Sequence, residues 1–125
     1  MPDTDTSKGS RIMSITNALA SVAVNDLSSA VQWYQRLFGR PPDSEQEPDV
    51  VGWKFEQGGW LQVYKNAERA GYGSVTLAVS SLDEQIADLE KRGIDSGRPM
   101  ISANVRVVMI KDQDGNSIAF VETIE

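Results

Sequence analysis

The sequence predicts an α+β fold in which one strand–helix–strands unit occurs twice, and an internal repeat is the main support for this prediction. Residues 19–27 align with residues 74–82, because in both an alternating apolar strand runs into a polar pair and then a leucine. Residues 60–64 align in the same way with residues 117–121, and each of these follows a glycine turn. Both matches have an offset of about 55 residues, so we expect a duplication that covers nearly the whole chain.

Each copy contains one well-marked helix. The first is predicted after Asp26, whose carboxylate can accept a hydrogen bond from the first turn, and it ends at Gly39. The second is predicted after a capping box formed by Ser81 and Glu84, and it ends at Gly93. A helix therefore follows the first strand of each copy, as a duplication requires.

Alternation along the strands separates two faces. One set is apolar, includes Val22, Val24, Leu61 and Val63, and is expected to face the helices. The other set mixes small, hydroxyl and aromatic side chains, with less charge than a face in bulk water and more polar groups than a dry core. It predicts a concavity that a ligand enters, although an oligomer interface has the same composition. Its members are Leu19, Ser21 and Ala23; Trp60, Gln62 and Tyr64; Ser74, Thr76 and Ala78; and Ser117, Ala119 and Val121.

Two further strands are predicted at residues 50–56 and 105–110, each before the last strand of its copy. The stretch 40–48 contains three prolines and is read as a loop or short edge strand, with residues 96–100 in the equivalent place. The run 112–116 is read as a hairpin turn, because the glycine comes too early for a calcium loop.

Residues 24–39 resemble the first strand-to-helix signature of the vicinal oxygen chelate superfamily, which includes glyoxalase I, bleomycin-resistance proteins and extradiol dioxygenases. Residues 72–82 resemble the start of its second module, and residues 111–122 are similar to its C-terminal hairpin and last strand. The resemblance implies two tandem βαβββ modules that form a curved mixed sheet around a central cavity. It also implies a homodimer.

The domain organisation follows from this resemblance. We expect a flexible N-terminal extension at residues 1–13 and a single domain at residues 14–125. Within the domain, the first module is expected at about residues 14–68 and the second at about residues 72–125.

Enzymes of the superfamily hold a divalent metal through four inward positions, which carry histidine, glutamate or glutamine. Carried over residue by residue, these positions are Leu19, Gln62, Ser74 and Ala119. Only Gln62 has a donor suited to the ion, and one neutral amide cannot hold it against water. We therefore expect no metal, no other cofactor and no catalytic residue of the family type.

Composition narrows the chemistry further. The chain of 125 residues has no cysteine and no histidine, which excludes thiol nucleophiles, zinc–thiolate sites and a Ser-His-Asp triad. Its 12 basic and 18 acidic residues give a net charge of −6, which argues against nucleic acid or a membrane as partner. The polar N-terminus lacks the apolar segment of a signal peptide, so we expect a cytoplasmic protein.

The candidate ligand-binding residues come from the second, mixed face of the strands, together with Arg106 from the strand predicted at residues 105–110. Trp60 and Tyr64 can stack on a flat ligand or pack in an interface, and Trp53 is a weaker candidate of the same kind. Hydroxyl and amide groups can orient a ligand or satisfy one another, and Arg106 can clamp an anion or join a plain ion pair. The complete candidate set is Ser21, Trp60, Gln62, Tyr64, Ser74, Thr76, Arg106 and Ala119.

Three functions are consistent with these observations. The first is a metal-free protein that sequesters or carries a compact, partly aromatic small molecule. The second is a glyoxalase-like lyase or isomerase that uses Glu56, Tyr64 or Arg106, or a dioxygenase-related enzyme with an atypical site. The third is an interaction module whose cavity has closed.

Overall fold

The computed structural model describes residues 14–123, so the extension predicted at residues 1–13 lies outside the described residues. Within that range two helices accompany two four-stranded sheets. In chain order the elements are β1 (Leu19–Val24), α1 (Leu27–Phe38), β2 (Ser44–Glu47), β3 (Val50–Lys54), β4 (Trp60–Lys65), β5 (Ser74–Ala78), α2 (Leu82–Lys91), β6 (Met100–Ser102), β7 (Val105–Lys111) and β8 (Ser117–Thr123).

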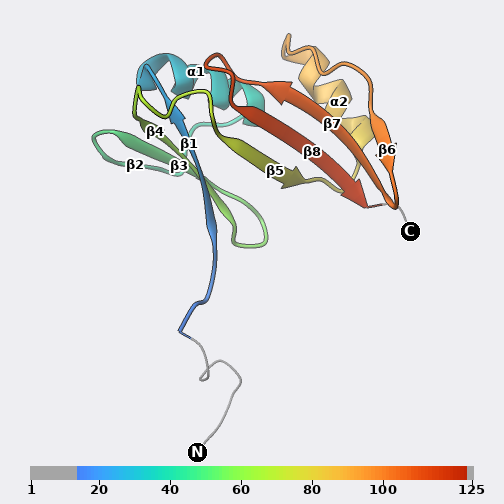
Figure 1. The fold of residues 1–125 in the computed structure, drawn as a ribbon, viewed down its shortest axis with the longest axis horizontal. Coiled ribbons are helices and arrows are strands. Elements are labelled where there is room, and N and C mark those ends of the chain that lie inside the picture. The colour runs from blue at the N-terminus through green and yellow to red at the C-terminus, as the bar shows by residue number, and fades with distance from the viewer. Residues whose placement is uncertain (1–13, 124–125) are drawn as a thin grey trace, which may run out of the picture.

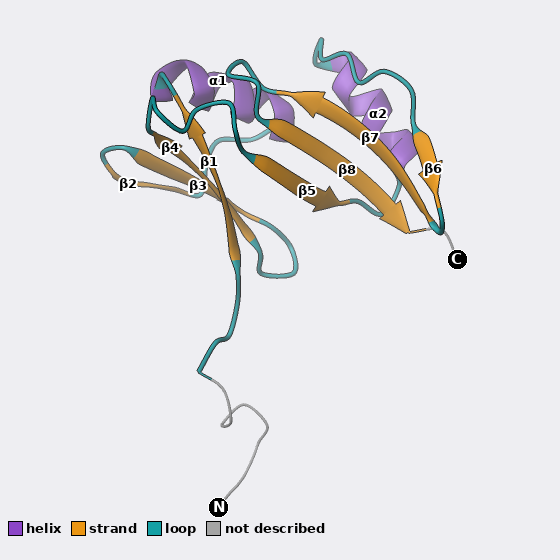
Figure 2. Cartoon of the chain, viewed as in Figure 1, coloured by secondary structure: helices purple, strands orange, loops and turns teal. Residues whose placement is uncertain are grey.

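The two sheets have the same topology. Their strand orders are β1-β4-β3-β2 and β5-β8-β7-β6, so each unit runs βαβββ, as predicted (Figure 2). The first and last strands of each unit are parallel, and the other neighbours are antiparallel. We call the β1–β4 unit module 1 and the β5–β8 unit module 2. The sheets lie side by side, with β1 next to β5 (Figure 1).

Both helices lie on the same side of the two sheets, and the core forms between them and the strands (Figure 1). The strand residues predicted to face the helices are buried there, including Val22, Leu61, Ile118 and Phe120. The first helix contributes Tyr34 and Leu37 to the same core, since its apolar residues recur at helical spacing. No helix among the described residues has the length and hydropathy that a membrane span needs.

The helix boundaries at Gly39 and Ser81 confirm the end signals in the sequence, whereas the side chain of Asp26 forms no capping hydrogen bond with the helix backbone. Gly39 ends α1 in the left-handed conformation at φ 73°, which a residue with a Cβ adopts only with strain. Ser81 begins α2, and its hydroxyl accepts a hydrogen bond from the backbone N–H of Glu84 at 3.2 Å. The Asp26 carboxylate instead accepts a hydrogen bond from the Ser29 hydroxyl at 2.6 Å, which is the main reason that its pKa is lowered.

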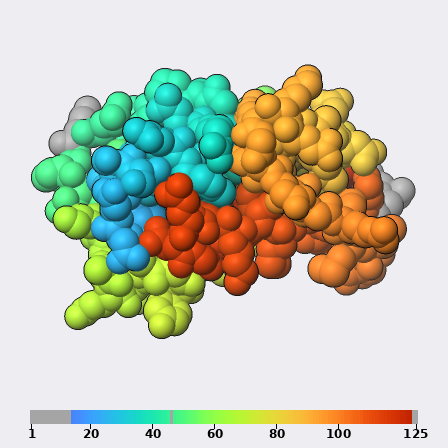
Figure 3. Space-filling view, turned by 90° about the horizontal axis from the view of Figure 1, so that it is seen from above, coloured from blue at the N-terminus to red at the C-terminus, as the bar shows by residue number. Residues whose placement is uncertain are grey.

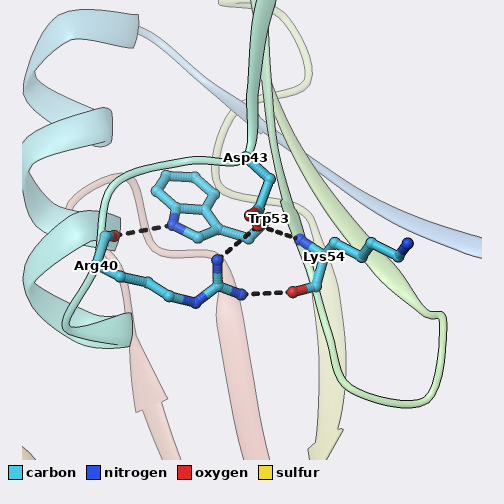
Figure 4. A network of polar contacts seen from close by, with 4 residues as sticks. All are labelled: Arg40, Asp43, Trp53 and Lys54. Atoms are coloured by element: carbon cyan, nitrogen blue, oxygen red, sulfur yellow. Dashed lines mark hydrogen bonds and ion pairs between the residues drawn. The ribbon is translucent and has the colours of Figure 1, made fainter.

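The segment after α1 is held by a polar network over β3 (Figure 4). Arg40 donates from Nη1 to Asp43 at 2.6 Å and from Nη2 to the carbonyl of Lys54, while Asp43 accepts from the Lys54 backbone N–H at 2.7 Å. The Trp53 indole donates to the Arg40 carbonyl at 3.1 Å. The stretch predicted as loop or edge strand therefore forms the short edge strand β2, supported by its preceding loop.

A turn whose first and last residues are buried joins the two modules. We call residues 112–116 the junction turn. Asn116 is fully buried, and its Nδ2 donates to the carbonyl of Ala23 on β1 at 2.8 Å. Its Oδ1 accepts from the backbone N–H groups of Gly71 and Gly73 at 3.1 and 2.7 Å. The predicted hairpin turn is confirmed, and it also ties module 2 to β1 and to the linker, which is the segment 66–73 between β4 and β5. Figure 3 shows the red turn residues against the blue end of β1.

The junction turn also receives a side chain from α1. The Tyr34 hydroxyl donates to Asp112 Oδ2 at 2.6 Å, and both residues are buried. Burial of the phenol, followed by this hydrogen bond, raises the pKa of Tyr34 far above its ordinary value. Tyr34 therefore stays protonated and acts as a hydrogen-bond donor between the modules.

A candidate ligand-binding face

The side of the sheets that faces away from the helices is not covered by any other described element. We call it the open face. Residues of neighbouring strands stand in register across it, which arranges the side chains of module 1 in three rows. From β3 through β4 to β1, these rows are Lys54–Trp60–Leu19, Gly52–Gln62–Ser21 and Val50–Tyr64–Ala23.

The indole of Trp60 leans over Gly52. A Cβ built on Gly52 would lie 3.2 Å from the Cε3 and 3.4 Å from the Cζ3 of the Trp60 ring. The backbone of Gly52 is not in the left-handed region, so its conformation does not require glycine. The missing side chain instead leaves the space in which the Trp60 ring lies against β3, half-buried, with part of its surface open.

The next two rows add polar and aromatic groups. The Ser21 hydroxyl donates to Gln62 Oε1 at 3.3 Å, which leaves the Gln62 amide N–H groups to donate elsewhere. Tyr64 lies two residues further along β4. Together with Ser21 and Ala23 it lines a hollow of about 310 Å³, and the linker residues Glu68, Arg69 and Tyr72 also line this hollow.

The open face of module 2 carries smaller side chains on its two inner strands. Ser74 and Thr76 are exposed on β5, and Ala119 lies beside Thr76 on β8. The largest apolar side chain is that of Met109, which is opposite Ala119 and 50% exposed. From β7 through β8 to β5, the rows are Lys111–Ser117–Ser74, Met109–Ala119–Thr76 and Val107–Val121–Ala78.

Seven of the eight predicted ligand-binding residues lie on the open face, and Arg106 does not. Arg106 shares the parity of the buried Val108 and therefore points to the helix side of β7. Its guanidinium lies 3.1 Å from Asp83 on α2 and 3.6 Å from Glu122 on β8. It forms the ion pair that the sequence left as its alternative, and it is separated from the other candidates by the sheet.

Trp53 must also be removed from the set of ligand-contact candidates. It is fully buried on the helix side of β3, with its ring centroid 5.3 Å from that of Phe38. The residues that sequence reasoning missed are its neighbours Gly52 and Lys54, which have the opposite parity. The run Val50-Val51-Gly52 hides this parity, because two apolar residues stand next to each other before a glycine.

The four positions at which the superfamily binds metal do not suit a divalent ion here. Leu19 and Ala119 have hydrocarbon side chains, and Ser74 offers only a hydroxyl beside the amide of Gln62. Among the described residues, no group of three carboxylates comes close enough together to replace them. The donor chemistry of this chain therefore does not fit the metal centre of its relatives.

The three residues of the enzymatic alternative do not converge. Glu56 lines a hollow of about 470 Å³ between the modules, with Phe55, Asp88 and Arg92 among its neighbours. Tyr64 lies on the open face and Arg106 lies on the helix side. The three groups therefore lie in different parts of the fold and do not share one of the described hollows.

The sequence matches no family model and no curated protein. Among solved structures, it is similar to a glyoxalase/bleomycin resistance protein from Catenulispora acidiphila DSM 44928. That match has 35% identity and a TM-score of 0.78, and it covers 86% of this chain and 97% of the other.

Two further matches show the same fold. One is TnmS3, an antibiotic binding protein from Streptomyces sp. CB03234, with 22% identity, a TM-score of 0.72 and coverage of 89% and 98%. The other is a lactoylglutathione lyase from Agrobacterium tumefaciens, with 20% identity, a TM-score of 0.71 and coverage of 88% and 94%.

Proposed function

The chain belongs to the glyoxalase/bleomycin resistance protein family of the vicinal oxygen chelate superfamily, and we propose that it is a metal-free small-molecule-binding protein. It sequesters or carries a compact, partly aromatic ligand on the open face. The observation that carries the proposal is the set of open-face residues along β4, which are Trp60, Gln62 and Tyr64 and which we call the β4 row. The small residues Ser21 and Gly52 flank it on the neighbouring strands.

This arrangement has the features of a small-molecule site. Two aromatic rings supply contact area, and one amide and several hydroxyls supply directed hydrogen bonds, as in most ligand pockets. The small residues on the strands to either side leave room above the sheet. The similar structure of TnmS3, described as an antibiotic binding protein, supports a ligand of this kind.

The second module completes the site in this proposal. Ser74, Thr76 and Ala119 are small side chains, two of them with hydroxyl groups, on β5 and β8. These strands continue the open face beyond β1. Ala119 takes no part through a functional group and is proposed as a contact that leaves space. Arg106 is not included, since it lies on the other side of the sheet.

A second copy of the chain is proposed to cover the outer part of the open face. Met100 on β6 and Met109 on β7 are large apolar side chains of this outer part, and they are 62% and 50% exposed. Neighbouring exposed apolar side chains of this kind are typical of a protein–protein interface. Light scattering after gel filtration should give the mass of a dimer, and the double variant Met100→Lys, Met109→Lys should shift it to a monomer. A wild-type monomer at micromolar concentration would contradict this part of the proposal.

The binding proposal is tested by thermal denaturation in the presence of EDTA, against a panel of antibiotics and aromatic metabolites. A ligand at one hundred times its Kd should add about 2.7 kcal/mol to the free energy of unfolding. For a chain of this size that is a rise in Tm of roughly 10 °C. The rise should be absent in Trp60→Leu. If no compound stabilises the protein but a divalent ion does, the proposal is wrong.

A further inference from the structure

The charges on the open face differ from those of the chain as a whole. The protein has a net charge of −6. In the six rows that β1, β3, β4, β5, β7 and β8 contribute there is no aspartate or glutamate, while Lys54 and Lys111 are both present. Two carboxylates lie at the edges of the face and away from Lys54 in the strand register: Glu47 on β2, opposite Val50, and Glu68, next to Arg69 in the hollow beside Tyr64.

Lys54 lies directly beside Trp60. It is the cross-strand neighbour of Trp60, so their Cβ atoms are about 5 Å apart. In Figure 4 its side chain runs away from the helix side, where Trp53 lies. Within the part of the chain that the structure describes, no ion pair or cation–π contact involves its ammonium.

Two more features of the same site favour a ligand with acceptor atoms. The Gln62 carbonyl oxygen accepts from Ser21, so the amide presents N–H donors to whatever lies above it. Gly52 leaves the space that the Trp60 ring occupies, and part of the indole surface stays exposed on the open face. A planar ring can then stack on the indole while its charged group reaches Lys54.

We propose that the open face of module 1 binds a planar aromatic acid, with its ring system on Trp60, its anionic group at Lys54 and Gly52 as the positioning residue that orients the indole. This inference rests on the proposed binding function and adds the ligand class. It assigns a role to two residues outside the candidate set of the sequence. The proposed ligand is an anion, whereas the net charge of −6 alone would favour a cation.

The test is calorimetric titration with four probes of similar size: 2-naphthoate, 2-naphthamide, 2-naphthylmethylammonium and cyclohexanecarboxylate. Wild-type protein should bind 2-naphthoate about three- to tenfold more tightly than the ammonium probe, since the ion pair is partly exposed. It should bind cyclohexanecarboxylate at least about fivefold more weakly than 2-naphthoate, because the stacking contact is lost.

Matched variants locate the effect. Lys54→Gln should abolish the preference for the acid, whereas Lys111→Gln, at the equivalent position of module 2, should keep it. Gly52→Ala should weaken binding several-fold, because the added methyl would lie 3.2 Å from the indole and displace it. Gly59→Ala is the control for this substitution, since nothing lies within 4 Å of its added Cβ.

Several results would overturn the inference. Equal affinity for 2-naphthoate and 2-naphthylmethylammonium would show that the site does not select an anion. Equal affinity for 2-naphthoate and cyclohexanecarboxylate would show that the ligand does not stack on the indole. A larger effect of Lys111→Gln than of Lys54→Gln would place the anion on the other module. If none of the four probes binds, the aromatic-acid inference fails by itself, while the binding function is still decided by the thermal panel and Trp60→Leu.

Discussion

The two modules have the same strand register but different open faces. Row by row, Lys54 corresponds to Lys111, and the pair Gly52 and Gln62 corresponds to Met109 and Ala119. The larger side chain of this pair is Gln62, on the last strand, in module 1, and Met109, on the third strand, in module 2. On the helix side, by contrast, both modules keep apolar core residues. The two modules therefore share an apolar face toward the helices and differ on the uncovered face.

A second difference lies in the turn before the last strand of each module. Module 1 has Gly58 and Gly59 there, and no atom of the other module lies within 4 Å of a Cβ built on either glycine. Module 2 has Gly115 and the buried Asn116, whose amide bonds to β1 and to the linker. At this position module 2 therefore has a buried amide that ties the modules together, whereas module 1 has a glycine with no side chain to do so.

The largest expected effect follows from this second difference. Asn116→Ala removes the hydrogen-bond partner of one buried and two partly buried backbone groups, which should lower the free energy of unfolding by about 2–4 kcal/mol. Gly59→Ala, at the corresponding place in module 1, should change it by less than about 0.5 kcal/mol. Urea denaturation measures both. Equal effects would show that the two turns are equivalent after all.

The next effect concerns the two helices. Tyr34 of α1 corresponds to Leu89 of α2, and only Tyr34 has a hydroxyl that reaches the junction turn. Tyr34→Phe should cost about 1–3 kcal/mol, because it leaves the buried Asp112 without this donor. A control variant, Tyr72→Phe, changes a side chain that is exposed and should have little effect.

Tyr34 also gives a pH dependence with a defined sign. The pKa of its hydroxyl is raised in the folded state from an ordinary value of 10.0, so the folded protein holds the proton more tightly than the unfolded chain. The resulting stability is complete below pH 10.0 and is lost as the pH rises above it. Denaturation curves between neutral and alkaline pH should show this loss in wild type and a smaller one in Tyr34→Phe. An identical loss in both would contradict the assignment.

A smaller effect is expected for the charges on β3 and β7. Arg106→Gln breaks a partly exposed ion pair on the helix side, which should cost about 1 kcal/mol or less. Because Arg106 lies across the sheet from the open face, this variant should bind ligand as wild type does, unlike Lys54→Gln. Loss of ligand affinity in Arg106→Gln would return Arg106 to the site.

The smallest effect is expected for the loop that supports β2. The hydrogen bond from Arg40 is the main cause of the lowered pKa of the exposed Asp43 carboxyl. A lowered folded pKa gives stability that is present above the ordinary value of 3.8 and disappears as the pH falls below it. Thermal melts should therefore separate Asp43→Asn slightly from wild type at neutral pH and not at acid pH. A difference that persists at acid pH would require another cause.

Much of the fold follows from local patterns in the sequence. The repeat, the alternation around Val22 and Leu61, and the end signals at Gly39 and Ser81 predict the modules, the core face and the helix limits. These features are short-range and periodic, so one sequence contains them. The predicted strand at residues 50–56 ends earlier, at Lys54, where the turn before β4 begins.

The candidate site was less accessible to this reasoning because it depends on pairing between strands. The proximity of Ser21 and Gln62 follows only from the register of β1 against β4. Lys54 gave no signal of its own, since an isolated exposed lysine is common on any surface. The role of Asn116 was hidden for the same reason: a turn motif does not say which distant backbone its amide will reach.

The central claim is that ligand binding takes place at the β4 row of module 1 without a metal ion. The most direct measurement is an NMR titration, in EDTA, of the indole N–H signals with the compound that stabilises the protein most. We predict that the Trp60 signal shifts with ligand concentration, while those of the buried Trp33 and Trp53 change little. A Trp60 signal that does not move, or one that moves only after a divalent ion is added, would contradict the account.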